Sequence, residues 1–157
     1  MDTFISNSPE ETFALGRRWA AELRPGWIVG LIGDLGTGKT QLVKGIAAGL
    51  GIPGTVTSPT FALHREHDNG SLPLTHIDLY RLESQQEIVG AGLEHYLTTP
   101  DGVTAAEWFE RWLGGDWQPG QALPESARPG AGHVLRLVIF SEEGETKRKI
   151  TYEDFGH

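Results

Sequence analysis

The sequence predicts an α/β fold, and two features indicate it. Residues 27–32 form a continuous apolar run of the kind found in buried strands, and a glycine-rich segment over residues 33–38 follows it. Apolar residues then recur at helical spacing as far as residue 50. Two later strand-like segments, 74–78 and 103–107, each end in an acidic residue. Strands that alternate with helices are typical of α/β proteins with a parallel sheet.

A short edge strand and a helix are expected before the first buried strand. Residues 3–5 favour the strand. Ser8 can cap the helix, Pro9 suits its first position, and Glu11 completes the pattern S-x-x-E. Apolar residues at four-residue spacing then predict one buried helix face: Leu15, Trp19 and Leu23.

Residues 33–40 fit the phosphate-binding pattern G-x-x-x-x-G-K-[ST]. Glycines allow successive backbone N–H groups to turn toward phosphates, and the N-terminus of the following helix adds partial positive charge. Lys39 would place a full charge near the β- and γ-phosphates, and the Thr40 hydroxyl can ligate Mg²⁺. The alternative is a chance match in a chain with 21 glycines, but the flanking strand and helix would then also agree by accident.

The middle of the chain predicts a β-hairpin. Residues 55–67 alternate loosely, the turn sequence Asp-Asn-Gly-Ser occupies 68–71, and an apolar strand returns over 72–78. A second S-x-x-E pattern at Ser84 predicts a short helix toward Ile88 or Tyr96, made irregular by two glycines. A strand of small residues over 103–106 and a short helix through residue 112 are expected next.

The last part of the chain predicts a long loop and a second hairpin. Residues 113–132 are rich in Gly and Pro, and we expect a mobile loop. Residues 133–140 alternate as a strand does and can pair with 149–152 across the turn at 142–145. Arg148 lies between two lysines, and we expect it on the solvated face of that strand. A length of 157 residues favours one domain over 1–157.

Composition narrows the function classes. The net charge of −8 disfavours nucleic-acid binding through bulk electrostatics. The absence of cysteine excludes disulfides and thiolate metal sites. No apolar run approaches the roughly 20 residues of a membrane-spanning helix, and the first residues do not resemble a secretory signal, so we expect a cytoplasmic protein without a membrane partner.

A phosphate-binding loop needs a further carboxylate at the end of a neighbouring strand to hold Mg²⁺ or its water. Asp78 and Glu107 both satisfy this requirement, and either could instead be a structural helix cap. Thr60 could sense the γ-phosphate as a switch-loop threonine does, or belong to an ordinary proline turn. For His76 we expect packing or hydrogen bonding rather than metal ligation. Neither asparagine lies in the guanine-reading pattern N-K-x-D, which favours ATP over GTP.

The chain resembles the TsaE (YjeE) family of bacterial ATPases. Four blocks occur in the order and at the spacing of that family: residues 33–40, 58–61, 76–82 and the pair Glu107-Trp108. The resemblance implies a P-loop NTPase with three α/β/α layers and a mixed, largely parallel central sheet. It also implies slow ATP hydrolysis that supports threonylcarbamoyladenosine formation at position 37 of tRNA by acting on the TsaD–TsaB complex, with only indirect contact with tRNA.

The same resemblance implies roles for particular residues. ATP or ADP and Mg²⁺ would be the cofactors, with Thr40 and Glu107 as the metal ligands. Lys39, Asp78, Glu107 and Thr60 would be the catalytic group, with Asp78 near the metal or the attacking water. The loop and its flanks would bind the nucleotide through Asp34, Leu35, Gly36, Thr37, Gly38, Lys39, Thr40 and Gln41. Glu11, at the start of the first helix, would lie near adenine together with Ser8 or Thr12. Tyr80, Arg81 and Trp108 would lie beside the site.

Two departures from the family pattern carry expectations of their own. The strand before Glu107 is less apolar than is usual in the family, which predicts looser packing, and the segment 114–132 is longer than usual.

Two other functions remain open. One is a P-loop small-molecule kinase, although the only plausible lid, 114–132, contains a single arginine, Arg128. The other is a nucleotide-dependent binding module whose hydrolysis is incidental.

Overall fold

Seven strands in the described part of the chain form one sheet, in the order β1-β7-β6-β2-β5-β4-β3. The computed structural model describes residues 1–34, 36–54 and 64–156. Neighbouring strands among β6, β2, β5 and β4 are parallel, and the outer pairs are antiparallel. The prediction of a mixed sheet with a parallel centre is therefore confirmed. The strands are β1 (Asp2–Ser6), β2 (Trp27–Ile32), β3 (His64–His67), β4 (Leu74–Asp78), β5 (Val103–Glu107), β6 (Val134–Glu142) and β7 (Arg148–Gly156).

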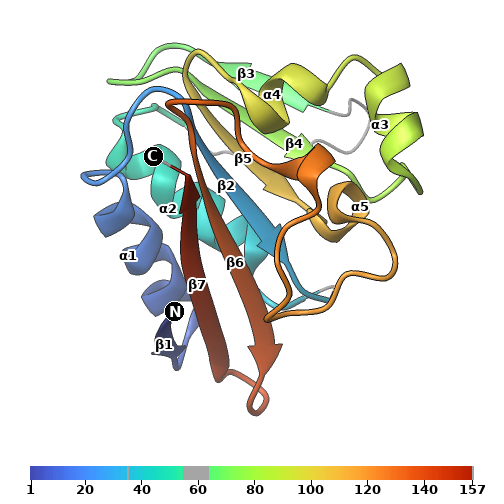
Figure 1. Ribbon diagram of the computed structural model, residues 1–157. Coiled ribbons are helices and arrows are strands. Elements are labelled where there is room, and N and C mark those ends of the chain that lie inside the picture. The colour runs from blue at the N-terminus through green and yellow to red at the C-terminus, as the bar shows by residue number, and fades with distance from the viewer. Residues whose placement is uncertain (35, 55–63, 157) are drawn as a thin grey trace.

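Helices cover both faces of this sheet, so the fold has three layers (Figure 1). One face packs against α1 (Pro9–Trp19) and α2 (Lys39–Gly49). The other packs against the shorter helices, which are α3 (Gln85–Gly90), α4 (Glu94–Thr98), α5 (Glu110–Leu113) and the 3₁₀ turn η1 (Glu125–Ala127). Strand β2 serves both cores because alternate side chains point to opposite faces: Val29 and Leu31 to the first, Ile28 to the second.

Helices α1 and α3 begin where the two S-x-x-E patterns predict. The Ser8 hydroxyl accepts a hydrogen bond from the Glu11 amide at 3.2 Å, and Ser84 accepts one from Glu87 at 3.1 Å. The reciprocal bond differs from the expected one: the Glu11 carboxylate accepts from the Asn7 amide rather than from Ser8. The Ser8 cap is therefore formed, but Glu11 accepts its hydrogen bond from the amide of the residue before Ser8.

Helices α1 and α2 approach each other closely because glycines line their contact. A Cβ on Gly45 would lie 2.1 Å from the carbonyl oxygen of Phe13, and one on Gly16 would lie 2.3 Å from that of Leu42. Each glycine therefore lets the backbone of the other helix approach to a distance that any side chain would prevent. This contact brings the start of α1 beside the phosphate-binding loop.

The described parts of both predicted hairpins are present. Strands β3 and β4 pair antiparallel, as do β6 and β7, and β1 is the predicted edge strand, paired with β7. Residues 55–63 of the first hairpin lie outside the described residues. The expectation of loose packing around β5 is wrong, since Val103, Ala105 and Ala106 are each at most 1% exposed. Their small side chains allow both helical layers to approach the strand closely.

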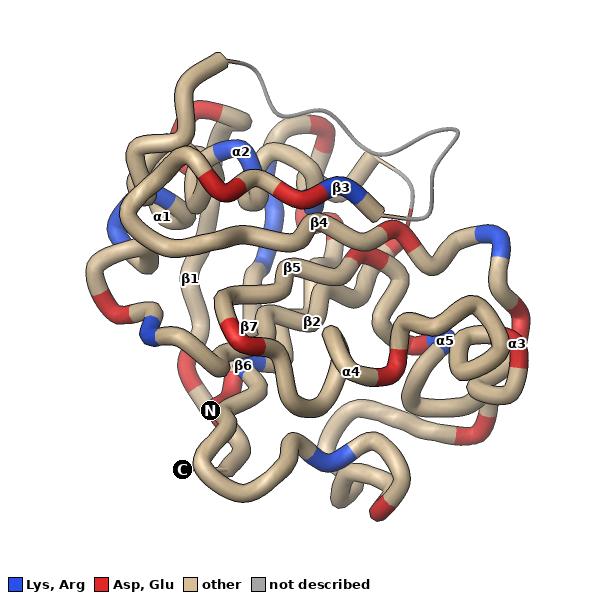
Figure 2. Tube along the Cα trace, turned by 90° about the horizontal axis from the view of Figure 1, so that it is seen from above, with Lys and Arg blue, Asp and Glu red and all other residues tan. Residues whose placement is uncertain are grey.

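The segment 113–132 packs on the second core through Leu123 and Ala127. Its mobility, like the single domain over 1–157, stays a prediction. Figure 2 shows Lys and Arg spread over several elements rather than gathered on one. Within the described ranges, no helix has both the length and the apolar character needed to cross a membrane.

Candidate functional site

The predicted site residues meet at the carboxyl ends of three neighbouring parallel strands. In the sheet register, Leu31 of β2 pairs with Glu107 of β5, and Glu107 pairs with Asp78 of β4. The glycine-rich loop leaves β2 at the same edge and enters α2. Parallel strands with helical connections bring these ends together, which is why residues distant in sequence converge here.

The start of α2 is arranged as an anion site. Gly38 is its N-cap, with φ of 102°, and no side chain caps the first turn. That left-handed conformation suits glycine and turns the following amides toward the loop. The Thr37 hydroxyl donates to the Asp34 carbonyl at 2.7 Å, which closes the loop from within.

Lys39 is held inside the loop rather than extended into solvent. Its side chain is 5% exposed, and its ammonium donates to the carbonyl oxygens of Gly33 and Asp34. The ammonium also lies 3.9 Å from the centre of the Trp108 ring, a cation–π contact. Burial lowers the pKa of Lys39, against the opposing charges of Glu110, Glu107, Asp34 and Asp78. A poorly hydrated cation in this position would lose little water on binding an anion.

Thr40 and Glu107 are in direct contact. The Thr40 hydroxyl lies 2.9 Å from one carboxylate oxygen of Glu107 and 3.1 Å from the other, and Glu107 is 3% exposed. A hydroxyl beside a carboxylate is an all-oxygen donor pair, the chemistry that Mg²⁺ prefers. Mg²⁺ usually takes one or two protein ligands and completes its shell with phosphate and water. The residues present therefore fit Mg²⁺.

Asp78 lies beside this pair without joining it. Its carboxylate accepts a hydrogen bond from the Tyr80 amide at 2.9 Å. Burial raises the pKa of Asp78, that bond lowers it, and the charge of Glu107 raises it further. The strand-end position therefore brings both acidic candidates to one site, with Glu107 next to the loop threonine and Asp78 one strand farther away.

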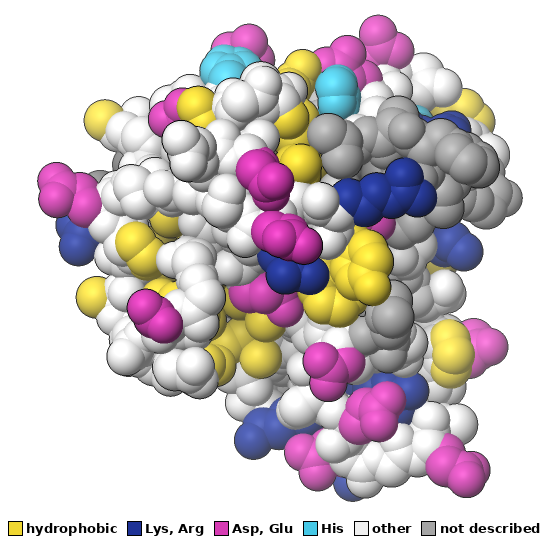
Figure 3. Space-filling view, turned by 90° about the vertical axis from the view of Figure 1, so that its right-hand side faces the viewer, with side chains coloured by type: hydrophobic (Ala, Val, Ile, Leu, Met, Phe, Trp, Pro, Cys, Tyr) yellow, Lys and Arg dark blue, Asp and Glu magenta, His cyan; other side chains and the backbone are white. Residues whose placement is uncertain are grey.

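Trp108 has a strained backbone. Its φ of 61° is the one positive value among the described residues other than glycine. Such a conformation is costly for a bulky side chain and is usually found where function requires it. It turns the ring over Lys39, and Tyr80 lies 4.9 Å from the same ring, centre to centre. Figure 3 shows apolar side chains on this side of the molecule, bordered by basic and acidic ones.

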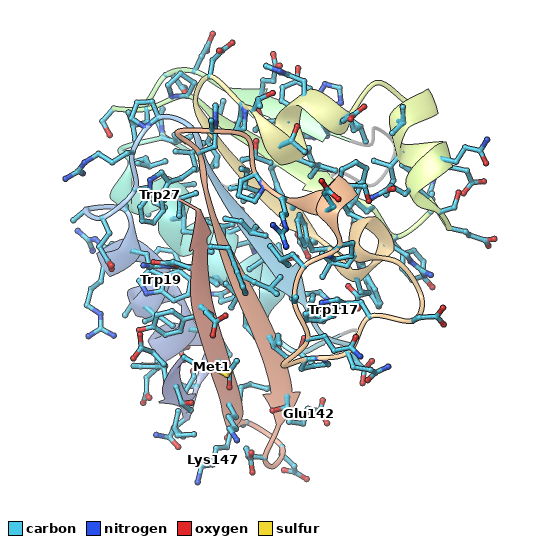
Figure 4. The ribbon with its side chains drawn as sticks, in the orientation of Figure 1. Met1, Trp19, Trp27, Trp117, Glu142 and Lys147 are labelled. Carbon is cyan, nitrogen blue, oxygen red and sulfur yellow. The ribbon has the colours of Figure 1, made fainter. Side chains whose placement is uncertain are left out.

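A pocket of about 110 Å³ opens beside the loop, between the start of α1 and the turn of the β6–β7 hairpin. Ser8, Thr12 and Gln41 line it, but Glu11 does not. The Glu11 side chain is bonded to Asn7 instead, so its contact with adenine stays a prediction. Figure 4 shows Glu142 and Lys147 at the hairpin turn that closes this side.

The prediction that Arg148 lies on the solvated face of a strand is wrong. Its side chain is 16% exposed and donates to the Gly36 carbonyl of the phosphate loop at 3.2 Å, so it is not on a solvated strand face. It also donates to three carbonyls of its own turn, including that of Gly144 at 2.9 Å. The lysines on either side suggested a charged surface, and no local pattern indicates a contact with a loop so distant in sequence.

Other predicted residues are only partly described. Leu35 and Thr60 lie outside the described residues. Arg81 is exposed, and Tyr80, 47% exposed, contributes its amide to Asp78. His76 is packed and hydrogen-bonded, as expected, but its partner is Glu107.

Comparison with known proteins identifies the family. The sequence profile of the family described as "Threonylcarbamoyl adenosine biosynthesis protein TsaE" matches residues 6–148. The tRNA threonylcarbamoyladenosine biosynthesis protein TsaE of Bacillus subtilis is 46% identical over 150 residues, which cover 96% of this chain and 84% of that protein. The protein of the same name from Nostoc is 45% identical over 145 residues, covering 90% and 80%. The crystal structure of Bacillus subtilis YdiB superposes with a TM-score of 0.69 at 31% identity, covering 96% of this chain and 83% of that one. The fold is that of a P-loop protein, and the chain belongs to the TsaE family.

Proposed function

We propose that this protein is a Mg²⁺-dependent ATPase that supports threonylcarbamoyladenosine formation at position 37 of tRNA. The observation that carries the proposal is the contact of Thr40 with buried Glu107, directly after a loop whose lysine is already turned inward. That combination provides a phosphate cradle and a hard-cation site a few ångströms apart. The relatives named for this biosynthesis support the pathway.

Each group of the site then has a part in nucleotide binding. The amides at the start of α2 and the Lys39 ammonium bind the β- and γ-phosphates. Thr40 and Glu107 would hold Mg²⁺, which when bound neutralises charge that develops on the phosphates. Asp78, which lies beside Glu107 in the sheet register and accepts a hydrogen bond from the Tyr80 amide, would lie near the metal or the attacking water. The pocket lined by Ser8 and Thr12 takes the sugar or base.

Hydrolysis would be slow without partners and would act on the pathway's proteins, the TsaD–TsaB complex, rather than on a small acceptor. The protein would meet tRNA only through these partners, since a net charge of −8 disfavours direct binding through bulk electrostatics. A cytoplasmic location accompanies this proposal.

The first test is ATP turnover of purified variants in the presence of the partner complex. Lys39→Ala and Glu107→Ala should each abolish turnover, and Glu107→Ala should do so with an unchanged circular dichroism spectrum. Lys44→Ala, on the same helix, is the matched control and should retain activity. Full hydrolysis by Glu107→Ala would remove that residue from the metal site.

The second test addresses the pathway. Deletion of the gene should remove threonylcarbamoyladenosine from bulk tRNA, measured by mass spectrometry, and the wild-type chain but not Lys39→Ala should restore it. Rescue by a variant that binds ATP without hydrolysing it would favour a binding module. Stoichiometric phosphorylation of a nucleoside or metabolite would favour a kinase instead.

A further inference from the structure

His76 is buried beside the proposed metal site. It is 0% exposed, and its Nε2 lies 2.6 Å from the Oε2 atom of Glu107. Within the described part of the chain, its Nδ1 has no hydrogen-bond partner. A carboxylate oxygen can only accept, so the imidazole proton of this pair belongs on Nε2. His76 is therefore a donor aimed at one oxygen of Glu107.

The sheet explains how the two side chains meet. His76 pairs with Ala105 across the parallel strands β4 and β5, two positions before Asp78 and Glu107. Alternate residues of a strand share a face, so His76 and Glu107 lie on the same side of the sheet. Ala105 has no side-chain atoms beyond Cβ, so it leaves room on this face of the sheet for the imidazole ring of the neighbouring His76.

We propose that His76 is a positioning residue that fixes the plane of the Glu107 carboxylate for the metal. This inference rests on the proposed function, which makes Glu107 a Mg²⁺ ligand. The terminal torsion of a glutamate is broad, so an unrestrained carboxylate samples many orientations. A short bond to Oε2 from a buried donor, together with the Thr40 hydroxyl close to both oxygens, restricts this orientation. Hydrogen bonds of this kind typically strengthen metal binding by about 10–100-fold.

A histidine that only filled the core would behave differently. Its removal would lower the stability of the fold. Each molecule that still folded would bind the metal with the same affinity as the wild type. The two roles are therefore separated by metal affinity measured on the folded fraction and by a substitution that keeps the donor.

The test compares His76→Leu, which removes the donor, with His76→Gln, whose amide N–H can reach the same oxygen. Thr75→Val, on the same strand but the opposite face, is the matched control. Mn²⁺ binding to the ADP complex is measured by electron paramagnetic resonance, and ADP binding without metal by calorimetry in EDTA. We expect His76→Leu to lose about 10–100-fold in Mn²⁺ affinity while ADP affinity without metal changes less than about twofold. His76→Gln should recover most of the loss, and Thr75→Val should match the wild type.

Wild-type Mn²⁺ affinity in folded His76→Leu would overturn the inference, as would equal losses in the Leu and Gln variants. If His76→Leu does not fold, His76→Gln and the ¹⁵N spectrum of the wild type decide. A proton on Nδ1 of His76 with none on Nε2 would contradict the donor role, and one on Nε2 with retained Mn²⁺ affinity in His76→Gln would support it. Glu107→Gln separates the role of His76 from that of Glu107, because unchanged Mn²⁺ affinity in that variant would overturn the assignment of Glu107 as a metal ligand, on which the role of His76 rests.

Discussion

The charged side chains around the glycine-rich loop are buried to a degree that costs stability. Lys39 and Glu107 are almost fully buried, and Glu110 is half-buried with its Oε1 unpartnered among the described residues. Burial raises the pKa of Glu110, although the positive charges of Lys39 and Arg111 oppose it. Ionised Glu110 is therefore less favourable in the folded state than in the unfolded one.

Glu110→Gln should accordingly stabilise the protein at neutral pH. A raised folded-state pKa means that the contribution of Glu110 is most favourable below its unfolded value of 4.5 and is lost as pH rises through the folded value. The variant should therefore have the higher free energy of unfolding at pH 7, and the difference should disappear near pH 4. Urea unfolding at both pH values measures this. Glu143→Gln, an exposed site with the same charge change, should show no such gain.

Arg148 is expected to stabilise the loop in its nucleotide-binding form, because it links the β6–β7 turn to the Gly36 carbonyl. Arg148→Ala should weaken ADP binding by roughly 2- to 12-fold, the equivalent of one hydrogen bond. Calorimetry measures the affinity, with the neighbouring Lys149→Ala as control. Equal affinities for wild type and Arg148→Ala would show that the contact does not order the loop.

Among the elements, the pair α1 and α2 determines where the pocket beside the glycine-rich loop lies. Capping patterns, apolar spacing and the loop motif all predicted these helices from local sequence. Their close contact was not predicted, because glycine in a helix is normally unfavourable and only the opposing backbone reveals its use. The acidic residues at the ends of β4 and β5 were predicted because each directly follows a strand-like run in the sequence. The hydrogen bond from His76 to Glu107 was not predicted, because only the register of the two strands brings these side chains together.

Gly45→Ala should disrupt the contact between α1 and α2. The added methyl group would lie 2.1 Å from the Phe13 carbonyl, so the helices must separate. We expect a loss of about 1–3 kcal/mol in the free energy of unfolding, measured with urea. Gly90→Ala, in α3 with open space around it, should be neutral or slightly stabilising. A neutral Gly45→Ala would contradict the close approach.

At the scale of the whole molecule, Arg136 joins three elements far from the phosphate loop. It lies on β6, 4% exposed, and donates to Asp154 of β7 at 2.7 Å and to Glu22 after α1 at 3.1 Å. Its guanidinium also contacts the rings of Trp19 and Trp27. Figure 4 shows both tryptophans on the side of the sheet that carries α1. Neither the strand order nor this cluster could be predicted, since pairing between distant strands leaves no local pattern.

Arg136→Lys should therefore destabilise the fold although the charge is kept. Lysine cannot form the two-pronged contact with Asp154 or stack on the rings. Because Asp154 and Glu22 are themselves partly exposed, we expect a loss of only about 1–2 kcal/mol in thermal or urea unfolding. Arg17→Lys, exposed on α1, is the control. ATP binding by the folded variant should be unchanged, which separates this cluster from the site.

The strand order has a consequence for synthesis on the ribosome. Strand β2 lies between β5 and β6, and β1 pairs with β7. A nascent chain thus exposes its glycine-rich loop long before the sheet around it can close, since β6 and β7 follow the other five described strands in the sequence. Until then the edge of β2 that pairs with β6 is unpaired, and β1 lacks β7, the strand with which it pairs in the folded protein. Completion of the sheet therefore waits for β6 and β7, so synthesis that stops before β6 would leave both β1 and β2 without these partners.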